Sequence, residues 1–268
     1  MAIERIKVQR YAIAVRGLPR ELDGLRILHV SDTHYGPFIG RAHVAHAARV
    51  AEAEAVDLVC FTGDYVHRTS RAIEGGVALL ARFHGRLGAV AVLGNHDHWE
   101  GVARCREAFA RIGVPLIDND RRFLTPDGLA RHTPVGPAIC LGGVGDLAED
   151  ETRFDFATAD APPHMPRIIL AHNPDSAERA PPDLRIDLML SGHTHGGQVA
   201  FPGIGAPLVP SRYGRRYAGG LCQGPHFPVI VSRGVGLALL PFRFRVPPEI
   251  GVITLRRIED DAPTGGGA

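Results

Sequence analysis

Histidine and aspartate recur in five short polar clusters along the 268-residue chain. The clusters read Asp32-Thr33-His34, Gly63-Asp64, Gly94-Asn95-His96-Asp97, His172-Asn173 and Gly192-His193-Thr194-His195. Their carboxylate, imidazole and amide-carbonyl groups, without a thiolate, suit borderline cations such as Mn²⁺, Fe or Zn²⁺. Seven of these residues are candidate metal ligands: Asp32, His34, Asp64, Asn95, His172, His193 and His195. Because one ion takes about four to six ligands, the set indicates two divalent ions that share a bridging carboxylate.

Each cluster also has a plainer interpretation when it is taken alone. Asp32-x-His34 is usually a turn, Gly63-Asp64 is an ordinary loop pair, and His172 could begin a turn or cap a short helix at residues 176–180. The runs GNHD (94–97) and GHTHGG (192–197) are more specific. All five clusters occur in order, each after a predicted strand, which makes coincidence a poor explanation of the whole set.

Short apolar runs precede the clusters and predict the elements that position them. The runs at 26–30, 56–61, 89–93, 138–141, 168–170 and 188–190 are apolar on both faces, which is typical of buried strands. Helices are predicted at 41–55, 70–85 and 100–112, and the early order is therefore β-α-β-α-β, an α/β arrangement. Further strands are predicted at 229–232 and 250–255, with a hairpin turn at 126–128. Because ligands in open α/β sheets bind beyond the C-terminal ends of the strands, we expect the clusters to converge.

Composition excludes several classes of protein. The chain has 30 basic and 29 acidic side chains, a formal net charge of +1, 45% hydrophobic residues and 22% charged residues. These values are ordinary for a soluble globular protein and exclude general disorder, a disulfide-stapled miniprotein and a collagen-like fibre. They provide no excess positive charge for duplex nucleic acid, so we expect no specific nucleic-acid binding.

Size and targeting signals favour one soluble domain. We expect a single domain over residues 1–258 and a disordered tail at 259–268. The four cysteines form no CxxC pair and suit a reducing cytoplasm. The apolar run at 11–15 is too short for a signal peptide or a membrane span. We therefore expect a cytoplasmic protein, with peripheral membrane association as an open alternative; the sequence does not indicate an oligomeric state.

The five clusters, which read SDTH, TGD, GNHD, AHNPD and SGHTHGG, resemble the five blocks of the calcineurin-like metallophosphoesterase superfamily. The runs GNHDHW (94–99), SRYGRRYAGG (211–220) and LPFRFRVPPEI (240–250) are similar to a bacterial branch that includes membrane-associated phosphodiesterases and UDP-2,3-diacylglucosamine pyrophosphatases. The resemblance covers roughly residues 24–256 and implies a four-layer α/β/β/α sandwich that holds two metal ions. Many members of the branch carry an N-terminal membrane anchor, and this chain shows none, which argues against a membrane substrate. A lipid-linked substrate is kept as an alternative.

The resemblance also implies a role for each site residue. Asp32, His34 and His195 would hold the first metal, Asn95, His172 and His193 the second, and Asp64 would bridge the two. His96 would stay off the metals, beside the phosphate, and act as the catalytic acid. The last candidate catalytic residue, Asp97, would orient an imidazole; the alternative is that it caps a helix ahead of Glu100.

The leading interpretation is a dinuclear-metal hydrolase of phosphate esters, with Mn²⁺ as the favoured ion. Two divalent ions, two carboxylates and a bridging hydroxide leave about +1 at the centre, which attracts a phosphate and prepares the hydroxide for in-line attack. Small-molecule phosphodiesters or pyrophosphate-linked substrates are expected. The alternatives are a metal-dependent nuclease, a broad phosphomonoesterase, and a non-catalytic scaffold, which should have lost ligands that this chain keeps.

Aromatic and basic residues around the clusters have no assigned role. Tyr35, Phe38, His98 and Trp99 flank the clusters and would line either a pocket or its packed rim. Arg212, Arg215, Arg216 and Arg233 would contact phosphate, or the first three would form an exposed basic turn.

Overall fold

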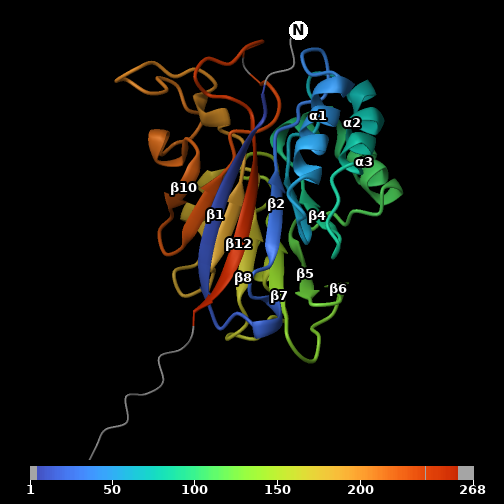
Figure 1. Cartoon of the computed structure of the whole chain (residues 1–268), viewed down its shortest axis with the longest axis vertical. Coiled ribbons are helices and arrows are strands. Elements are labelled where there is room, and N and C mark those ends of the chain that lie inside the picture. Colours follow the sequence, from blue (N-terminus) through green and yellow to red (C-terminus); the bar gives the residue numbers. More distant parts are fainter. Residues whose placement is uncertain (1–4, 239, 259–268) are drawn as a thin grey trace, which may run out of the picture.

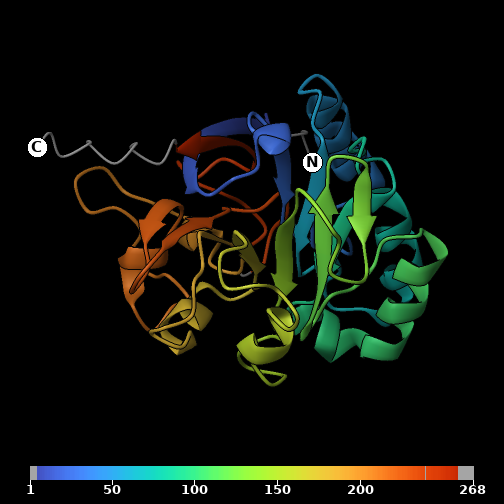
Figure 2. The ribbon, with the colours of Figure 1, turned by 90° about the horizontal axis from the view of Figure 1, so that it is seen from below.

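The structure is a computed structural model that describes residues 5–238 and 240–258. Two β-sheets pack face to face, and helices cover the outer face of each (Figures 1 and 2). The predicted α/β class and the α/β/β/α layering are therefore confirmed. The predicted disordered tail at 259–268 lies outside the described residues. One domain over 1–258 stays a prediction, which the core shared by the two sheets supports.

The first sheet has five strands in the order β1-β12-β2-β3-β4. They are β1 (Lys7–Arg16), β12 (Glu249–Ile258), β2 (Arg26–Val30), β3 (Leu58–Thr62) and β4 (Ala89–Val92). The strands β2, β3 and β4 are parallel, whereas β12 runs antiparallel to β2 and parallel to β1. The connections between β2, β3 and β4 contain α1 (Arg41–Glu52) and α2 (Ile73–Leu80), and α3 (Asn95–Arg111) follows β4 and leads to the second sheet. This order is the predicted β-α-β-α-β arrangement.

The second sheet has seven strands in the order β10-β11-β9-β8-β7-β5-β6. They are β10 (Gly220–Gln223), β11 (Pro228–Val231), β9 (Leu188–Ser191), β8 (Arg167–Leu170), β7 (Ile139–Gly143), β5 (Asp120–Thr125) and β6 (Gly128–Ala130). Its outer layer consists of short helices, among them α4 (Phe154–Ala157) and the 3-10 helices η3 (Pro174–Arg179) and η5 (Gly214–Tyr217). The remaining 3-10 turns are η1 (Arg20–Leu22), η2 (Ser70–Ala72) and η4 (His195–Gly197).

Three apolar layers hold the sandwich together. The central layer lies between the sheets and contains buried side chains from both, such as Ile27, Leu58, Leu141 and Ile168. A second layer joins α1, α2 and α3 to the first sheet, and a third joins the short helices to the second sheet. Central strands are buried on both faces, which explains why their sequences are continuous apolar runs instead of alternating patterns.

The predicted elements differ from the structure at several places, of which three concern whole elements or the site. Helix α3 begins at Asn95 instead of residue 100, with Gly94 as its N-cap, because the Asp97 carboxylate accepts the Gly94 N–H. The predicted helix at 70–85 is shorter, and residues 70–72 form the 3-10 turn η2. Strand β1 was not predicted, whereas the hairpin turn at 126–128 joins β5 and β6 as expected. Among the described residues, no helix is both long and apolar enough to span a membrane.

Candidate metal centre

All five polar clusters meet at one end of the sandwich, the upper end in Figure 1. They follow β2, β3 and β4 in the first sheet and β8 and β9 in the second. The side chains brought together are Asp32, His34, Asp64, Asn95, His172, His193 and His195. Parallel strands present their C-terminal ends at the same edge of a sheet, and this shared edge is why segments up to 163 residues apart converge, from Asp32 to His195.

One group of donors consists of Asp32, His34 and His195. The Oδ1 atom of Asp32 lies 3.2 Å from Nε2 of His195 and 3.8 Å from Nε2 of His34. The two imidazole Nε2 atoms are 2.9 Å apart, and all three residues are buried. A carboxylate oxygen and two ring nitrogens thus point at a common position, which is the arrangement that a cation requires.

A second group consists of Asn95, His172 and His193, with Asp64 beside them. The Nδ1 atom of His193 lies 3.0 Å from Oδ1 of Asn95 and 3.2 Å from Nε2 of His172. The other ring nitrogen of His172, Nδ1, lies 2.7 Å from the Thr62 carbonyl oxygen, which can only accept a hydrogen bond. That contact orients the ring and leaves Nε2 directed at the group, as is typical of metal-binding histidines.

Asp64 lies between the two groups. Its Oδ2 atom is 3.5 Å from Nε2 of His34 in the first group and 3.2 Å from Nε2 of His172 in the second. Its Oδ1 atom accepts the backbone N–H of His96 at 2.9 Å. The Asp64 carboxylate therefore faces both groups, and its role as a bridge between two ions stays a prediction.

The charges of the two groups favour cation binding. Burial opposes ionisation of Asp32 and Asp64, but neighbouring imidazoles outweigh it and hold the pKa of both carboxyl groups below the usual range. Burial lowers the pKa of His34 and lowers that of His193 to about 4, which keeps their nitrogen lone pairs available. Ionised carboxylates beside neutral imidazoles are the protonation states in which these side chains bind metal.

His172 is the exception among the imidazoles. Burial disfavours its charged form, but the adjacent Asp64 carboxylate outweighs burial and raises the pKa of the ring. Without a cation, a proton on His172 balances the buried negative charge of Asp64. A metal ion placed between them would take over that role.

The backbone is strained at five of the seven positions. Asp32, His34, Asp64, His193 and His195 all have a positive φ, between 45° and 66°. A non-glycine residue rarely adopts this conformation unless its surroundings impose it. The surrounding structure therefore imposes this conformation on the ligand loops, which holds their side chains at the site.

The glycines of the clusters permit the close approach of the loops. A Cβ atom on Gly63 would lie 2.6 Å from the Gly94 nitrogen and 2.7 Å from Nδ1 of His172. A Cβ atom on Gly192 would overlap Ser31 Oγ and Asp32 Oδ2. The glycine in each of these clusters is therefore required by the packing of one loop on the next.

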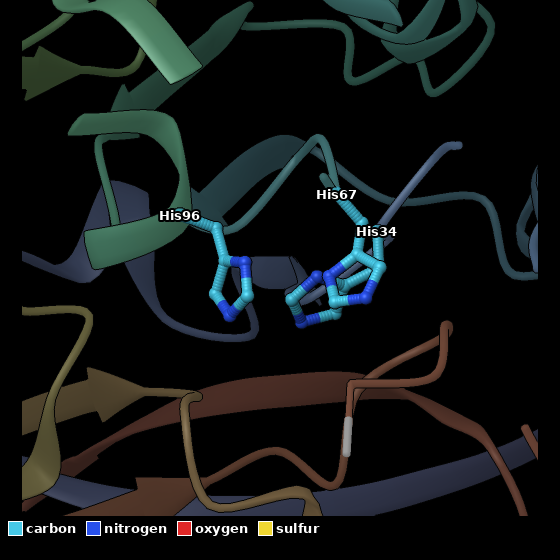
Figure 3. Close-up of side chains that lie close together, drawn as sticks. All are labelled: His34, His67 and His96. Carbon is cyan, nitrogen blue, oxygen red and sulfur yellow. The ribbon is translucent and has the colours of Figure 1, made fainter. Parts of the chain in front are cut away.

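His96 lies beside the donor groups, close to His34 and to a further histidine, His67 (Figure 3). The ring of His96 is 4.8 Å from that of His34, 4.9 Å from that of His67 and 4.6 Å from that of Trp99, measured between centroids. His67 is buried, and neither of its ring nitrogens has a hydrogen-bond partner. No sequence motif indicated His67, whose one signal is its position three residues after Asp64 at the end of TGDYVH.

Asp97 contacts backbone instead of an imidazole. Its carboxylate accepts the N–H groups of Asp64 at 2.8 Å, Tyr65 at 2.9 Å and Gly94 at 3.0 Å. It occupies the third position of α3 and is not the N-cap of a helix that begins near Glu100. Gly94 and not Asp97 is therefore the N-cap, and the contacts of the Asp97 carboxylate are with backbone groups. Its role in orienting an imidazole stays a prediction.

A pocket of about 200 Å³ opens next to the two groups of donors. The residues that line it include Asp64, Asn95, His96, Trp99, His193, His195, Gln198, Pro210 and Ala238. Burial lowers the pKa of the His96 imidazole at this pocket. Of the four flanking aromatic and imidazole side chains, Trp99 lines the pocket, and Tyr35 and Phe38 pack against the helical layer. His98 is half-buried and is not among the residues that line the pocket.

The arginines near the clusters differ in their contacts. Arg216 pairs with Glu178 at 3.0 Å, and Arg233 pairs with Glu249 at 2.8 Å. Arg243, which the sequence analysis did not single out, lies 3.3 Å from Nδ1 of His195 and donates to the backbone carbonyls of Arg233 and Gly236. Arg243 thus joins the loop after β11 to the donor groups.

Comparison with known proteins agrees with this arrangement. A model of the calcineurin-like phosphoesterase family matches residues 25–197, more than half of the chain. The uncharacterized metallophosphoesterase YkuE of Bacillus subtilis is 29% identical over 254 residues, which cover 94% of this chain and 86% of YkuE. The phosphodiesterase YaeI of Escherichia coli is 30% identical over 234 residues, which cover 86% of this chain and 82% of YaeI. The UDP-2,3-diacylglucosamine pyrophosphatase LpxG of Chlamydia trachomatis is 28% identical over 277 residues, which cover 85% of this chain and 83% of LpxG. The predicted family resemblance is therefore confirmed, and the chain belongs to the calcineurin-like phosphoesterase family.

Proposed function

We propose that this metallophosphoesterase hydrolyses phosphodiester or pyrophosphate-linked substrates with two divalent ions. The observation that carries the proposal is the position of Asp64, whose Oδ2 atom faces Nε2 of His34 at 3.5 Å and Nε2 of His172 at 3.2 Å. Asp32, His34 and His195 would hold one ion, and Asn95, His172 and His193 the other. Asp64 would be shared by both ions.

The chemistry of the donors fits such ions. Two carboxylates, four imidazoles and one amide oxygen form a mixed oxygen and nitrogen set without sulfur, which favours Mn²⁺ and also accommodates Fe or Zn²⁺. The Thr62 carbonyl holds the His172 ring in the orientation that a ligand needs. When bound, two such ions act as Lewis acids on a phosphoryl group and lower the pKa of coordinated water.

The remaining residues hold and position the reacting groups. His96 lines the pocket, and its backbone N–H donates to Asp64. A ring nitrogen of His96 also lies within 4.8 Å of ring nitrogens of His34 and His67, and we propose that His96 stays off the two ions. From there His96 would donate a proton to the leaving oxygen. Asp97 fixes the backbone of Asp64 and so positions the shared carboxylate. It is a positioning residue and does not itself touch the substrate.

The substrate class follows from relatives of known name. YaeI is named a phosphodiesterase, and LpxG is named a pyrophosphatase of a diacylated nucleotide sugar. These names support a phosphodiester or a pyrophosphate-linked substrate, which is either a small molecule or linked to a lipid. A cytoplasmic location with peripheral membrane association is part of the same proposal.

Metal analysis and a substrate panel test the proposal. After reconstitution with Mn²⁺, the protein should contain close to two ions per chain. It should hydrolyse bis(p-nitrophenyl) phosphate and a UDP-linked lipid faster than p-nitrophenyl phosphate. Asp64→Ala should lose most of the metal and the activity, whereas Asp127→Ala in an exposed turn should lose neither. One ion or none after reconstitution would contradict the dinuclear centre, and a preference for the monoester would contradict the substrate class.

A further inference from the structure

Two loops beside the candidate metal centre expose large apolar side chains. We call these side chains the apolar rim: Phe201, Ile204, Leu208, Leu240, Phe242 and Phe244. Each exposes between 40% and 64% of its surface. The loops lie at the upper end of Figure 1, in amber and red, where the polar clusters also meet. Exposed large apolar side chains that gather on neighbouring loops often mark an interaction site.

Hydrogen bonds between the two loops hold the apolar rim in a defined arrangement. The Ala200 N–H donates to the Phe244 carbonyl at 2.9 Å, and the Phe244 N–H donates to the Gln198 carbonyl at 3.0 Å. The Gln198 side-chain amide donates to the carbonyls of Leu240 at 2.6 Å and Phe242 at 2.8 Å. The rings of Phe201 and Phe244 lie 6.0 Å apart. The apolar side chains are thus held in place on a hydrogen-bonded frame.

The frame is continuous with the catalytic pocket. Gln198, which is buried, lines the pocket together with His193 and His195. Pro210 and Ala238, at the base of the two loops, line it as well. Whatever covers the apolar rim therefore lies at the entrance to the site at which phosphate would bind.

The charge of the residues around the apolar rim indicates which class of partner would cover it. Residues 196–248 contain six arginines and no aspartate or glutamate, in a chain whose net charge is only +1. Arg212, Arg215 and Arg245 are exposed, and the Arg215 guanidinium donates to the Ile204 carbonyl at 2.6 Å, directly within the apolar rim. Glu178 and Glu249 pair with Arg216 and Arg233, but the loops themselves carry exposed arginines and no acidic residue. They complement a surface whose outer part is anionic and whose interior is apolar. An anionic lipid bilayer has this structure.

We propose that the apolar rim docks on a bilayer that contains anionic lipid, with its side chains among the acyl chains and the exposed arginines at the headgroups. The pocket then opens at the level of the headgroup phosphates. The substrate would then be a phosphate ester that is anchored in the membrane. This inference about the substrate rests on the proposed function.

Vesicle co-sedimentation tests the docking separately from catalysis. The full chain should sediment with phosphatidylcholine vesicles that contain about 30% phosphatidylglycerol. It should sediment much less with vesicles of phosphatidylcholine alone. The double variant Ile204→Ser/Leu208→Ser should bind at least about tenfold more weakly. The variant Arg215→Gln should lose about fivefold, an effect that high salt should abolish. A matched double variant, Val135→Ser/Leu221→Ser, removes exposed apolar side chains that lie outside the apolar rim and should bind like the unmodified chain.

Hydrolysis of soluble bis(p-nitrophenyl) phosphate separates the two proposals. Ile204 and Leu208 do not line the catalytic pocket, so the double variant should keep this activity while it loses vesicle binding. Absence of binding to anionic vesicles by the unmodified chain would overturn the docking proposal and leave the proposed function standing. Equal binding by the rim and control variants would also overturn it, as would a concentration-dependent dimer that the rim variant abolishes.

Discussion

Asp97 offers a sharp test of how the Asp64 loop is held. Its carboxylate accepts three backbone N–H groups, those of Asp64, Tyr65 and Gly94, at 2.8–3.0 Å. The substitution Asp97→Ala leaves all three donors without a partner in a buried region. A buried unsatisfied donor costs about 1–3 kcal/mol, and entry of water offsets part of that cost. We expect the free energy of unfolding to fall by about 3–5 kcal/mol, a large part of the total for a domain.

The milder substitution Asp97→Asn keeps the fold intact and isolates the effect on the metal centre. Asparagine retains one acceptor oxygen, but its amide group now opposes one of the backbone donors. The Asp64 backbone, at a φ of 57°, should become less well fixed. Loss of such an outer contact typically lowers metal affinity by about 10–100-fold. Isothermal titration with Mn²⁺ measures the affinity, and urea unfolding measures stability.

Asp57 provides the matched control for this experiment. Its carboxylate accepts the Arg26 N–H at 2.7 Å and pairs with Arg86 at 2.6 Å, and both contacts lie at the start of the strands, away from the site. Asp57→Ala should lower stability without changing Mn²⁺ affinity. If folded Asp97→Asn binds Mn²⁺ within twofold of the unmodified chain, the inference that Asp97 positions Asp64 is refuted.

Three further substitutions have expected outcomes. His96→Asn should lower turnover by about 10²–10⁴-fold with both ions retained, and more for an alkyl phosphodiester than for p-nitrophenyl esters; an equal loss on both would exclude proton donation. His67→Phe removes two buried ring nitrogens without partners and should raise stability in urea by about 1 kcal/mol while it slows turnover; a loss of stability would show an unrecognised partner. Burial raises the pKa of Asp118 from 3.8 to about 6, so the stability that this group contributes is present below about pH 4 and is lost as the pH rises through 6. Asp118→Asn, which keeps the acceptor for the Leu93 N–H, should therefore be more stable than the unmodified chain by up to about 3 kcal/mol at pH 8, and a gain that does not shrink toward pH 4 would contradict this reasoning.

The sequence predicted the strands around the site because continuous apolar runs mark strands that are buried on both faces. It predicted convergence because each polar cluster follows such a run, as with Asp32 after β2 and His193 after β9. It did not predict His67, since no local pattern distinguishes a buried histidine that packs against other imidazoles. It did not reveal the partners of the Asp97 carboxylate, because all three belong to the backbone. Strand β1 was not predicted either, because its partner β12 lies about 240 residues further along the chain.

The place of β12 in the first sheet has a consequence for how the chain acquires its structure. This strand, from the end of the described chain, lies between β1 and β2, which come from its beginning. During synthesis β2 and β3 can pair early, but β1 has no neighbour to join until residue 249 has left the ribosome. Contacts that join such distant segments slow folding. The nascent chain therefore carries an open edge on β2 for most of its synthesis, and chaperone dependence should fall sharply once the last strand is available.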